Sequence, residues 1–246
     1  MLFRSTHFGT YLLMLKGMFT RPESGRMYWK EFMHQCVEIG IGALPIVIII
    51  SIFLGAVTTI QTAYQLVSPL VSQATIAQIV RDSMILELSP TVLCVVLAGV
   101  IGSKIASELG NMRISEQIDA LEIMGINTKS YLVMPKILAS LVVMPCLVVV
   151  SAVLGIWGGR FVGALTGILA PDIYDIGLRQ NLNEYNINFA LYKSYTFAFI
   201  ISSISCYFGY NVSGGALEIG RASTSAVVVS CILILVADYA LAALLL

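Results

Sequence analysis

Residues 107–127 read SELGNMRISEQIDALEIMGIN, a charged and helix-forming stretch that lies between two long apolar runs. The apolar run before it covers about residues 83–104, and the run after it begins at Pro135. Each run is long enough to cross about 30 Å of hydrocarbon as a helix, which takes roughly 20 apolar residues. The stretch between them therefore predicts a water-exposed loop that connects two membrane spans.

The composition predicts an all-α integral membrane protein. Of the 246 residues, 58% are hydrophobic and only 11% are charged, and the mean hydropathy is +0.89. Unpaired backbone polar groups are too costly in lipid, so apolar segments of this length must cross as helices. The formal net charge is zero, which gives none of the basic field that nucleic acids require, and we exclude nucleic acid as a partner.

Five segments are long and apolar enough to span the bilayer, and we expect five transmembrane helices. The third is too long for one straight crossing, so it should tilt, bend near Gly158 and Gly159, or project from the bilayer. The five expected spans cover about residues 39–66, 83–104, 135–169, 193–210 and 222–246.

The N-terminal region, residues 1–36, predicts an amphipathic helix in the headgroup region, followed by the transmembrane domain at 37–246. Phe8, Leu12, Leu15 and Phe19 have helical spacing, and aromatic and basic residues follow at 26–32. With a cytoplasmic N-terminus, the inside segments hold ten Lys and Arg residues and the outside segments four. This excess predicts that the N-terminus is cytoplasmic and the C-terminus is on the opposite, periplasmic side.

The charged stretch itself predicts a short, separate helix in the loop between the second and third spans. Gly110 suits the end of the second span, and Asn111 suits the N-cap of a new helix. Gly125 suits its C-terminal stop.

Apolar and acidic residues fall on different faces of this short helix. A helix this short is marginal alone, so it needs a surface to hold it. Two interpretations are open: it packs against the protein's own membrane helices, or it is presented to a groove on a cytoplasmic partner. The apolar stripe consists of Ile114, Ile118 and Leu121, with Met124 at its edge, and the acidic residues elsewhere on the surface are Glu116, Asp119 and Glu122.

Three motifs carry a resemblance to a known family. They are ELSPTVLCVVLAGVIGSKIASELGNMRISEQIDALEIMGINTKSYLVMP at 87–135, GIWGG at 155–159, and GYNVSGGALEIGRASTSAVVVS at 209–230. In this order and spacing they closely resemble the MlaE family of ABC-transporter permeases, and the likeness extends from about residue 31 onward. The chain departs from the family pattern at Leu86, where many members have arginine, and at Ser89, where glycine is usual.

The resemblance implies a homodimeric permease in the bacterial inner membrane that moves phospholipid between the inner and outer membranes. Its implied partners are two copies of a cytoplasmic ABC ATPase and a periplasmic ring of MCE-domain proteins. The chain has no G-x-x-x-x-G-K-[ST] phosphate loop, so we expect no ATPase site and no cofactor here, with ATP and Mg on the partner ATPase. The implied coupling residues are Arg113, Ile114, Glu116, Ile118, Asp119, Leu121 and Glu122.

Two acidic residues lie inside predicted spans, where charge is costly and marks candidate functional positions. Glu87 and Asp238 are both expected in the outer half of the bilayer, and Lys193 can pair with either. For Glu87 the open interpretations are a lipid-headgroup pathway or a structural pair, and for Asp238 the structural pair is favoured. A lipid pathway formed by these three residues is one hypothesis.

Small residues recur at every fourth position in two spans and let helix backbones approach closely. Gly155, Gly159 and Gly163 form one such ridge, and Gly102 belongs to another. They predict packing within one protomer or part of a dimer interface.

Two other function classes are open alternatives. A proton-coupled secondary lipid carrier could use the same three charged residues, but an odd number of spans and no visible inverted repeat count against it. A membrane-embedded enzyme would need a nucleophile with a nearby base or a metal-binding spacing, and the sequence predicts neither a catalytic nor a metal site.

Overall fold

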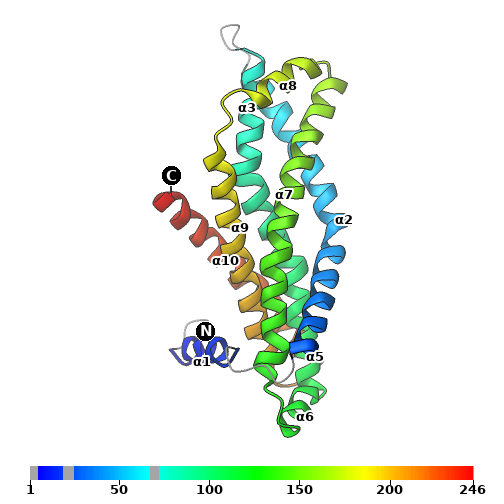
Figure 1. The fold of residues 1–246 in the computed structure, drawn as a ribbon, viewed down its shortest axis with the longest axis vertical. Helices are drawn as coiled ribbons and strands as arrows, with labels where there is room; N and C mark the ends of the chain where they lie inside the picture. The colour runs from blue at the N-terminus through cyan, green and yellow to red at the C-terminus, as the bar shows by residue number, and fades with distance from the viewer. Residues whose placement is uncertain (1–4, 19–24, 67–71, 246) are drawn as a thin grey trace. The chain divides into compact units, whose positions relative to one another are not determined.

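The computed structural model describes residues 5–18, 25–66 and 72–245, and no strand occurs among them (Figure 1). The predicted all-α class is therefore confirmed for this part of the chain. In order, the helices are α1 Ser5–Met18, α2 Gly25–Gln65, α3 Ala74–Ser83, η1 Met84–Val92, α4 Leu93–Leu97, η2 Ala98–Gly102, α5 Ser103–Ile114, α6 Gln117–Ile123, η3 Lys129–Val133, α7 Met134–Leu165, α8 Pro171–Arg179, α9 Glu184–Tyr210 and α10 Ala216–Leu245.

Four helical stretches within the described residues are long and apolar enough to cross a membrane, which identifies an integral membrane protein. They are Gly25–Gln65, Ala74–Ile114, Lys129–Leu165 and Ala216–Leu245. They contain nearly all of the predicted first, second, third and fifth spans. Leu66 of the first span and the part of the third span after Leu165 fall outside these helices. Leu246 of the fifth span lies outside the described residues.

The predicted fourth span falls in α9, which is long but less apolar than the other four. Its 27 residues extend about 40 Å at 1.5 Å per residue, enough to cross the hydrocarbon. Serines lower its hydropathy, and Ser202 and Ser203 are buried and donate to the carbonyls of Ala198 and Phe199 one turn earlier. The count of five spans stays a prediction.

The second span is part of a longer helical stretch than the sequence predicted. Helix continues from Ala74 to Ile114, through the π-helical segments η1 and η2. Pro90 lies within η1 and has no backbone N–H to donate. A missing N–H of this kind is a recognised cause of local distortion in a helix. Such π segments occur frequently at functional sites, and this one carries Glu87.

The N-terminal helix α1 is present, but its apolar side chains lie on more than one face. Met14 and Met18 are buried, whereas Leu12 and Leu13 are exposed. The predicted amphipathic, interfacial character is therefore not confirmed, and Phe19 lies outside the described residues.

The boundary predicted at residue 36 falls inside a helix. The aromatic residues Tyr28 and Trp29 lie in the first turns of α2, which continues through Pro45 to Gln65. The first span and the aromatic segment before it are thus one continuous helix.

The chain divides into two compact units, each with its own core. The first unit comprises Met1–Gly42, Val95–Val143 and Phe197–Ala237, and the second comprises Ala43–Cys94, Met144–Thr196 and Asp238–Leu246. In the first unit the fully buried apolar residues include Leu109 and Ile118.

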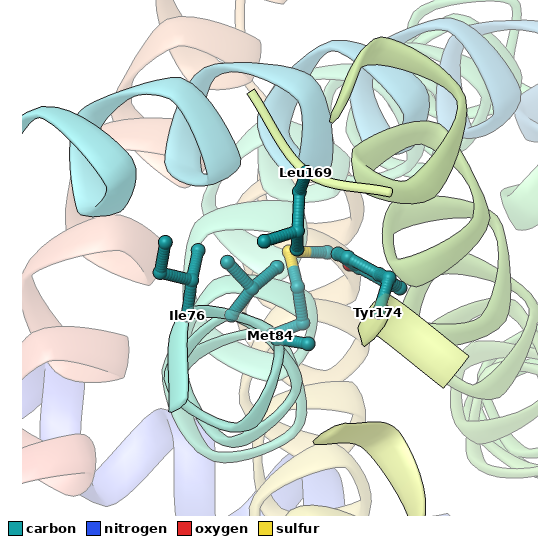
Figure 2. Packing of buried hydrophobic residues seen from close by; sticks show 6 residues of the cluster. Ile76, Met84, Leu169 and Tyr174 are labelled. Atoms are coloured by element: carbon teal, nitrogen blue, oxygen red, sulfur yellow. The ribbon is translucent and has the colours of Figure 1, made fainter. Parts of the chain in front are cut away.

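In the second unit α8 packs against α3, as Figure 1 shows. Figure 2 shows four side chains converging on one core: Ile76 of α3, Met84 of η1, Leu169 of the segment before α8, and Tyr174 of α8. Pro171 occupies the first turn of α8, where its missing N–H costs no hydrogen bond.

Glycines bring α2 and α7 into direct backbone contact in the second unit. A Cβ atom at Gly55 would overlap the carbonyl group of Gly155, and one at Gly155 would overlap the Met84 side chain. A Cβ at Gly159 would overlap Thr59 and Tyr174. Gly155 and Gly159 therefore pack within the protomer, one of the two predicted roles.

Gly55→Ala should strongly destabilise the protein, because the added methyl group meets backbone that cannot rotate away. Overpacking of this kind costs about 1–3 kcal/mol or more, and the thermal midpoint of the detergent-solubilised protein should fall by several degrees. Gly99→Ala is the matched control, since no atom lies within 4 Å of a Cβ built there. Equal midpoints for the two variants would contradict the packing role of Gly55.

Candidate functional site

In the second unit, three charged residues from different helices form one cluster. The ammonium Nζ of Lys193 in α9 lies 2.7 Å from Glu87 Oε1 in η1 and 2.7 Å from Asp238 Oδ1 in α10. It also donates to the backbone carbonyl of Leu86 at 3.1 Å. The sequence predicted that Lys193 can pair with either acid, and the structure pairs it with both.

Thr91 adds a hydroxyl group to this cluster. Its Oγ1 lies 3.1 Å from Glu87 Oε2 and 3.0 Å from Asp238 Oδ1, so it can donate to one carboxylate at a time. Thr91 stands one helical turn after Glu87, but the sequence analysis did not select it. The spacing of four residues was the signal that could have found it.

The members of the cluster differ in what they offer to a ligand. The side chain of Lys193 is 0% exposed, and its three N–H donors face Leu86, Glu87 and Asp238. The Glu87 side chain is 48% exposed and the Asp238 side chain 19%. The group accessible from outside is therefore a carboxylate acceptor, and the lysine has no donor left for an anion.

The second candidate feature lies in the first unit, where α6 follows α5 as a separate short helix (Figure 1). The break falls at Ser115 and Glu116, with Glu116 in the left-handed region at φ 59°. The predicted N-cap at Asn111 is wrong, because α5 continues through Gly110 and Asn111 to Ile114. The predicted stop is confirmed: α6 ends at Ile123, and Gly125 has φ 84°.

This correction divides the predicted coupling residues among α5, the turn after it and α6. Arg113 and Ile114 belong to the last turn of α5, and Glu116 is the residue at the turn. Ile118, Asp119, Leu121 and Glu122 lie in α6 itself.

The two faces of α6 have different surroundings. Ile118 is 0% exposed, so at this position the helix packs against its own protein. Ile123 is 87% exposed and Met124, just after the helix, is 66% exposed. Large apolar side chains that are this exposed mark a candidate contact surface, which we call the α6 tip: Ile123 and Met124.

Side-chain hydrogen bonds hold α6 in place. Arg113 of α5 forms an ion pair with Asp119 of α6. Glu122 Oε1 accepts from Tyr210 Oη at 2.9 Å and from Thr128 Oγ1 at 2.9 Å. The bond from Tyr210, followed by that from Thr128, holds the pKa of the Glu122 carboxyl below its ordinary value, because both stabilise the charged form.

Tyr210, Thr128 and Arg81 are further residues that the sequence analysis missed. Arg81 is buried in the second unit and donates to the backbone carbonyls of Leu178 and Gln180, both at 2.7 Å. No local pattern points to Tyr210 or to the partners of Arg81, because the bonded groups lie far apart in the sequence, whereas Thr128 lies only six residues from Glu122.

The remaining predicted glycines also contact their own chain. A Cβ at Gly163 would meet Leu169 and Thr59 at ordinary van der Waals distances, and one at Gly102 would lie 2.9 Å from Ser205 Oγ. Both contacts fit packing within the protomer.

A family model described as Permease MlaE matches residues 32–244 of the chain. The chain is also similar to a probable ABC transporter permease protein from Rickettsia bellii, at 39% identity over 213 residues that cover 87% of this chain and 82% of that protein. A probable ABC transporter permease protein from Synechocystis is 31% identical over 215 residues, which cover 87% of this chain and 81% of that protein.

A further similarity is to the Arabidopsis thaliana protein named TRIGALACTOSYLDIACYLGLYCEROL 1, chloroplastic. It is 34% identical over 218 residues, which cover 88% of this chain and 62% of that protein.

Proposed function

The chain belongs to the MlaE permease family, and from this premise we propose that it is the membrane-spanning subunit of an ATP-driven phospholipid transporter. The observation that carries the proposal is the match of the family across residues 32–244, together with relatives described as probable ABC transporter permeases. A relative named after a diacylglycerol lipid supports lipid as the transported class.

The proposed assembly follows from the family. Two copies of the chain form a homodimer in the bacterial inner membrane, with the N-terminus cytoplasmic and the C-terminus periplasmic. A separate cytoplasmic ABC ATPase binds ATP and Mg and supplies the energy, and a periplasmic MCE-domain protein receives or delivers phospholipid between the inner and outer membranes.

Glu87 is the residue of the charged cluster that we place on the lipid pathway. Lys193 is buried with its donors occupied, and Asp238 is largely covered. The half-exposed Glu87 carboxylate is held by Lys193 and by Thr91, so it can face a headgroup without leaving an unpaired charge in the membrane. Lys193 and Asp238 then act as its support.

The α6 tip is the surface that we place against the ATPase. Its two exposed apolar side chains, Ile123 and Met124, suit a groove on a partner protein. Ile118 of the predicted apolar stripe instead packs against its own protein. The α6 tip joins Met124, at the edge of that stripe, to Ile123, which the stripe did not include.

Reconstituted transfer tests the proposal and the role of Glu87 together. The complex with its ATPase should move labelled phospholipid between two membranes only when ATP is present. Glu87→Gln should lower the transfer rate by roughly tenfold, the order expected for a lost charged contact of about 1.5 kcal/mol, while assembly stays intact. Glu184→Gln, at an exposed acid in the first turn of α9, is the control and should transfer normally.

Two outcomes would contradict these assignments. Unchanged transfer by Glu87→Gln would remove this residue from the pathway. Loss of transfer on dissipating a proton gradient at constant ATP would favour the proton-coupled carrier over the ATP-driven permease.

A further inference from the structure

Three side chains of the first unit meet at one junction on the cytoplasmic side of the proposed topology. Glu122 Oε1 lies 2.9 Å from Tyr210 Oη and 2.9 Å from Thr128 Oγ1, and these two hydroxyl oxygens lie 2.8 Å apart. Thr128 and Tyr210 are buried. We call this set the Tyr210 junction: Glu122, Thr128 and Tyr210.

The junction connects elements that are distant in the sequence. Glu122 is in the last turn of α6, Thr128 immediately precedes η3, and Tyr210 is the last residue of α9. It therefore ties α6, and the loop after it, to the end of α9.

The buried Ile118 side chain packs α6 against its own protein, and the Tyr210 junction is the polar contact that joins α6 to α9. A helix of seven residues is not stable alone and takes its position from its contacts. Its link to α5 runs through the turn at Ser115 and Glu116 and through the partly exposed pair of Arg113 and Asp119. Exposed ion pairs of this kind contribute little.

The negative charge of Glu122 strengthens its hydrogen bonds to Tyr210 of α9 and to Thr128. Glu122 is the acceptor of both hydroxyl groups, and hydrogen bonds to an ionised carboxylate are stronger than those between neutral groups. Thr128 and Tyr210 are buried, and if both were separated from Glu122 they could still bond each other, but one of the two hydroxyl hydrogens would lose its acceptor.

We propose that Tyr210 is a positioning residue that transmits movement of α6 to α9, and so sets how much lipid is moved for each ATP hydrolysed. The inference rests on the proposed function, in which the ATPase contacts the α6 tip. Helix α9 is uninterrupted from Glu184 to Tyr210 and also carries Lys193. Tyr210 and Lys193, which pairs with both acids of the charged cluster, therefore lie on the same helix.

Tyr210→Phe tests this inference, since it removes one hydroxyl group and keeps the ring. The reconstituted complex should assemble and hydrolyse ATP as the wild type does, while the ratio of lipid transferred to ATP hydrolysed falls. Single substitutions can change the coupling between two sites by roughly 2- to 30-fold, so the ratio of lipid transferred to ATP hydrolysed should fall by a factor in this range. A purely structural role would lower assembly and both activities together, leaving the ratio unchanged.

Three further variants sharpen the test. Thr128→Val should lower the ratio as Tyr210→Phe does, and Thr128→Ser should restore it because the hydroxyl group is kept. Tyr207→Phe is the matched control: Tyr207 lies one turn earlier in α9, and its hydroxyl bonds His7 of α1, 2.9 Å away, instead of α6.

The outcomes separate this inference from the proposed function. Absence of ATP-dependent transfer by the wild type would contradict the proposed function. With an active wild type, an unchanged ratio in Tyr210→Phe, or an equal loss in Tyr207→Phe, would overturn the inference. Should Tyr210→Phe fail to assemble, identical ratios for Thr128→Val and Thr128→Ser would overturn it.

Discussion

Lys193→Met is expected to leave little folded protein in the membrane. The substitution removes the cation that Glu87 and Asp238 share, and the largely covered Asp238 carboxylate then faces a low-dielectric environment without it. Removing one partner of a buried pair costs about 3–5 kcal/mol, a large fraction of the roughly 5–15 kcal/mol that stabilises a folded protein. The yield of monodisperse protein after detergent extraction, and its thermal midpoint, measure the effect.

Two comparisons isolate the cause of this loss. Arg221→Met removes a cation from an exposed pair with Glu218 and should change stability little, because such pairs contribute about 0–1 kcal/mol. Adding Glu87→Gln and Asp238→Asn to Lys193→Met removes the uncompensated charge and should recover much of the folded yield. If Lys193→Met behaved like Arg221→Met, the cluster would not be needed for folding.

Ile123→Asp is expected to release the ATPase while the permease stays folded. Ile123 projects from the α6 tip into solvent, so a charge there costs nothing in the isolated protein and disrupts an apolar contact in the complex. Central contact residues contribute about 2 kcal/mol or more, so affinity should fall by roughly 30-fold or more. The amount of ATPase that copurifies with the permease measures this release, and an unchanged thermal midpoint of the permease shows that it is still folded.

Ile118→Asp gives the informative comparison on the same helix. Because Ile118 is fully buried, this variant should lose stability first and the ATPase only as a consequence. Ile176→Asp, on the exposed face of α8, is a control for surface charge and should retain the ATPase. Capture of the ATPase by Ile123→Asp at wild-type strength would show that the α6 tip is not the contact surface.

The ends of α6 show how far local sequence patterns reach. Gly125 was recognisable as a helix stop because glycine adopts positive φ at little cost. The start was predicted wrongly, because Gly110 remains helical and serves close packing: a Cβ there would lie 3.3 Å from Ile219 and 3.4 Å from Val212. The left-handed residue is instead Glu116, a residue type with no such preference.

The apolar stripe shows the same limit. Helical spacing was sufficient to place Ile118 on one face of the helix. The spacing did not indicate that Ile118 would be buried while Ile123 stays exposed, since that depends on which other helices surround α6.

By itself the sequence determined the all-α membrane class, four of the predicted spans and the family. These follow from hydropathy and motifs, which are carried by residues close together in the chain. It also indicated that charges within the spans need partners. Only the tertiary structure decided that Lys193 is shared by two acids and that Tyr210 bonds Glu122. Those contacts join segments many residues apart, and their geometry depends on how whole helices pack.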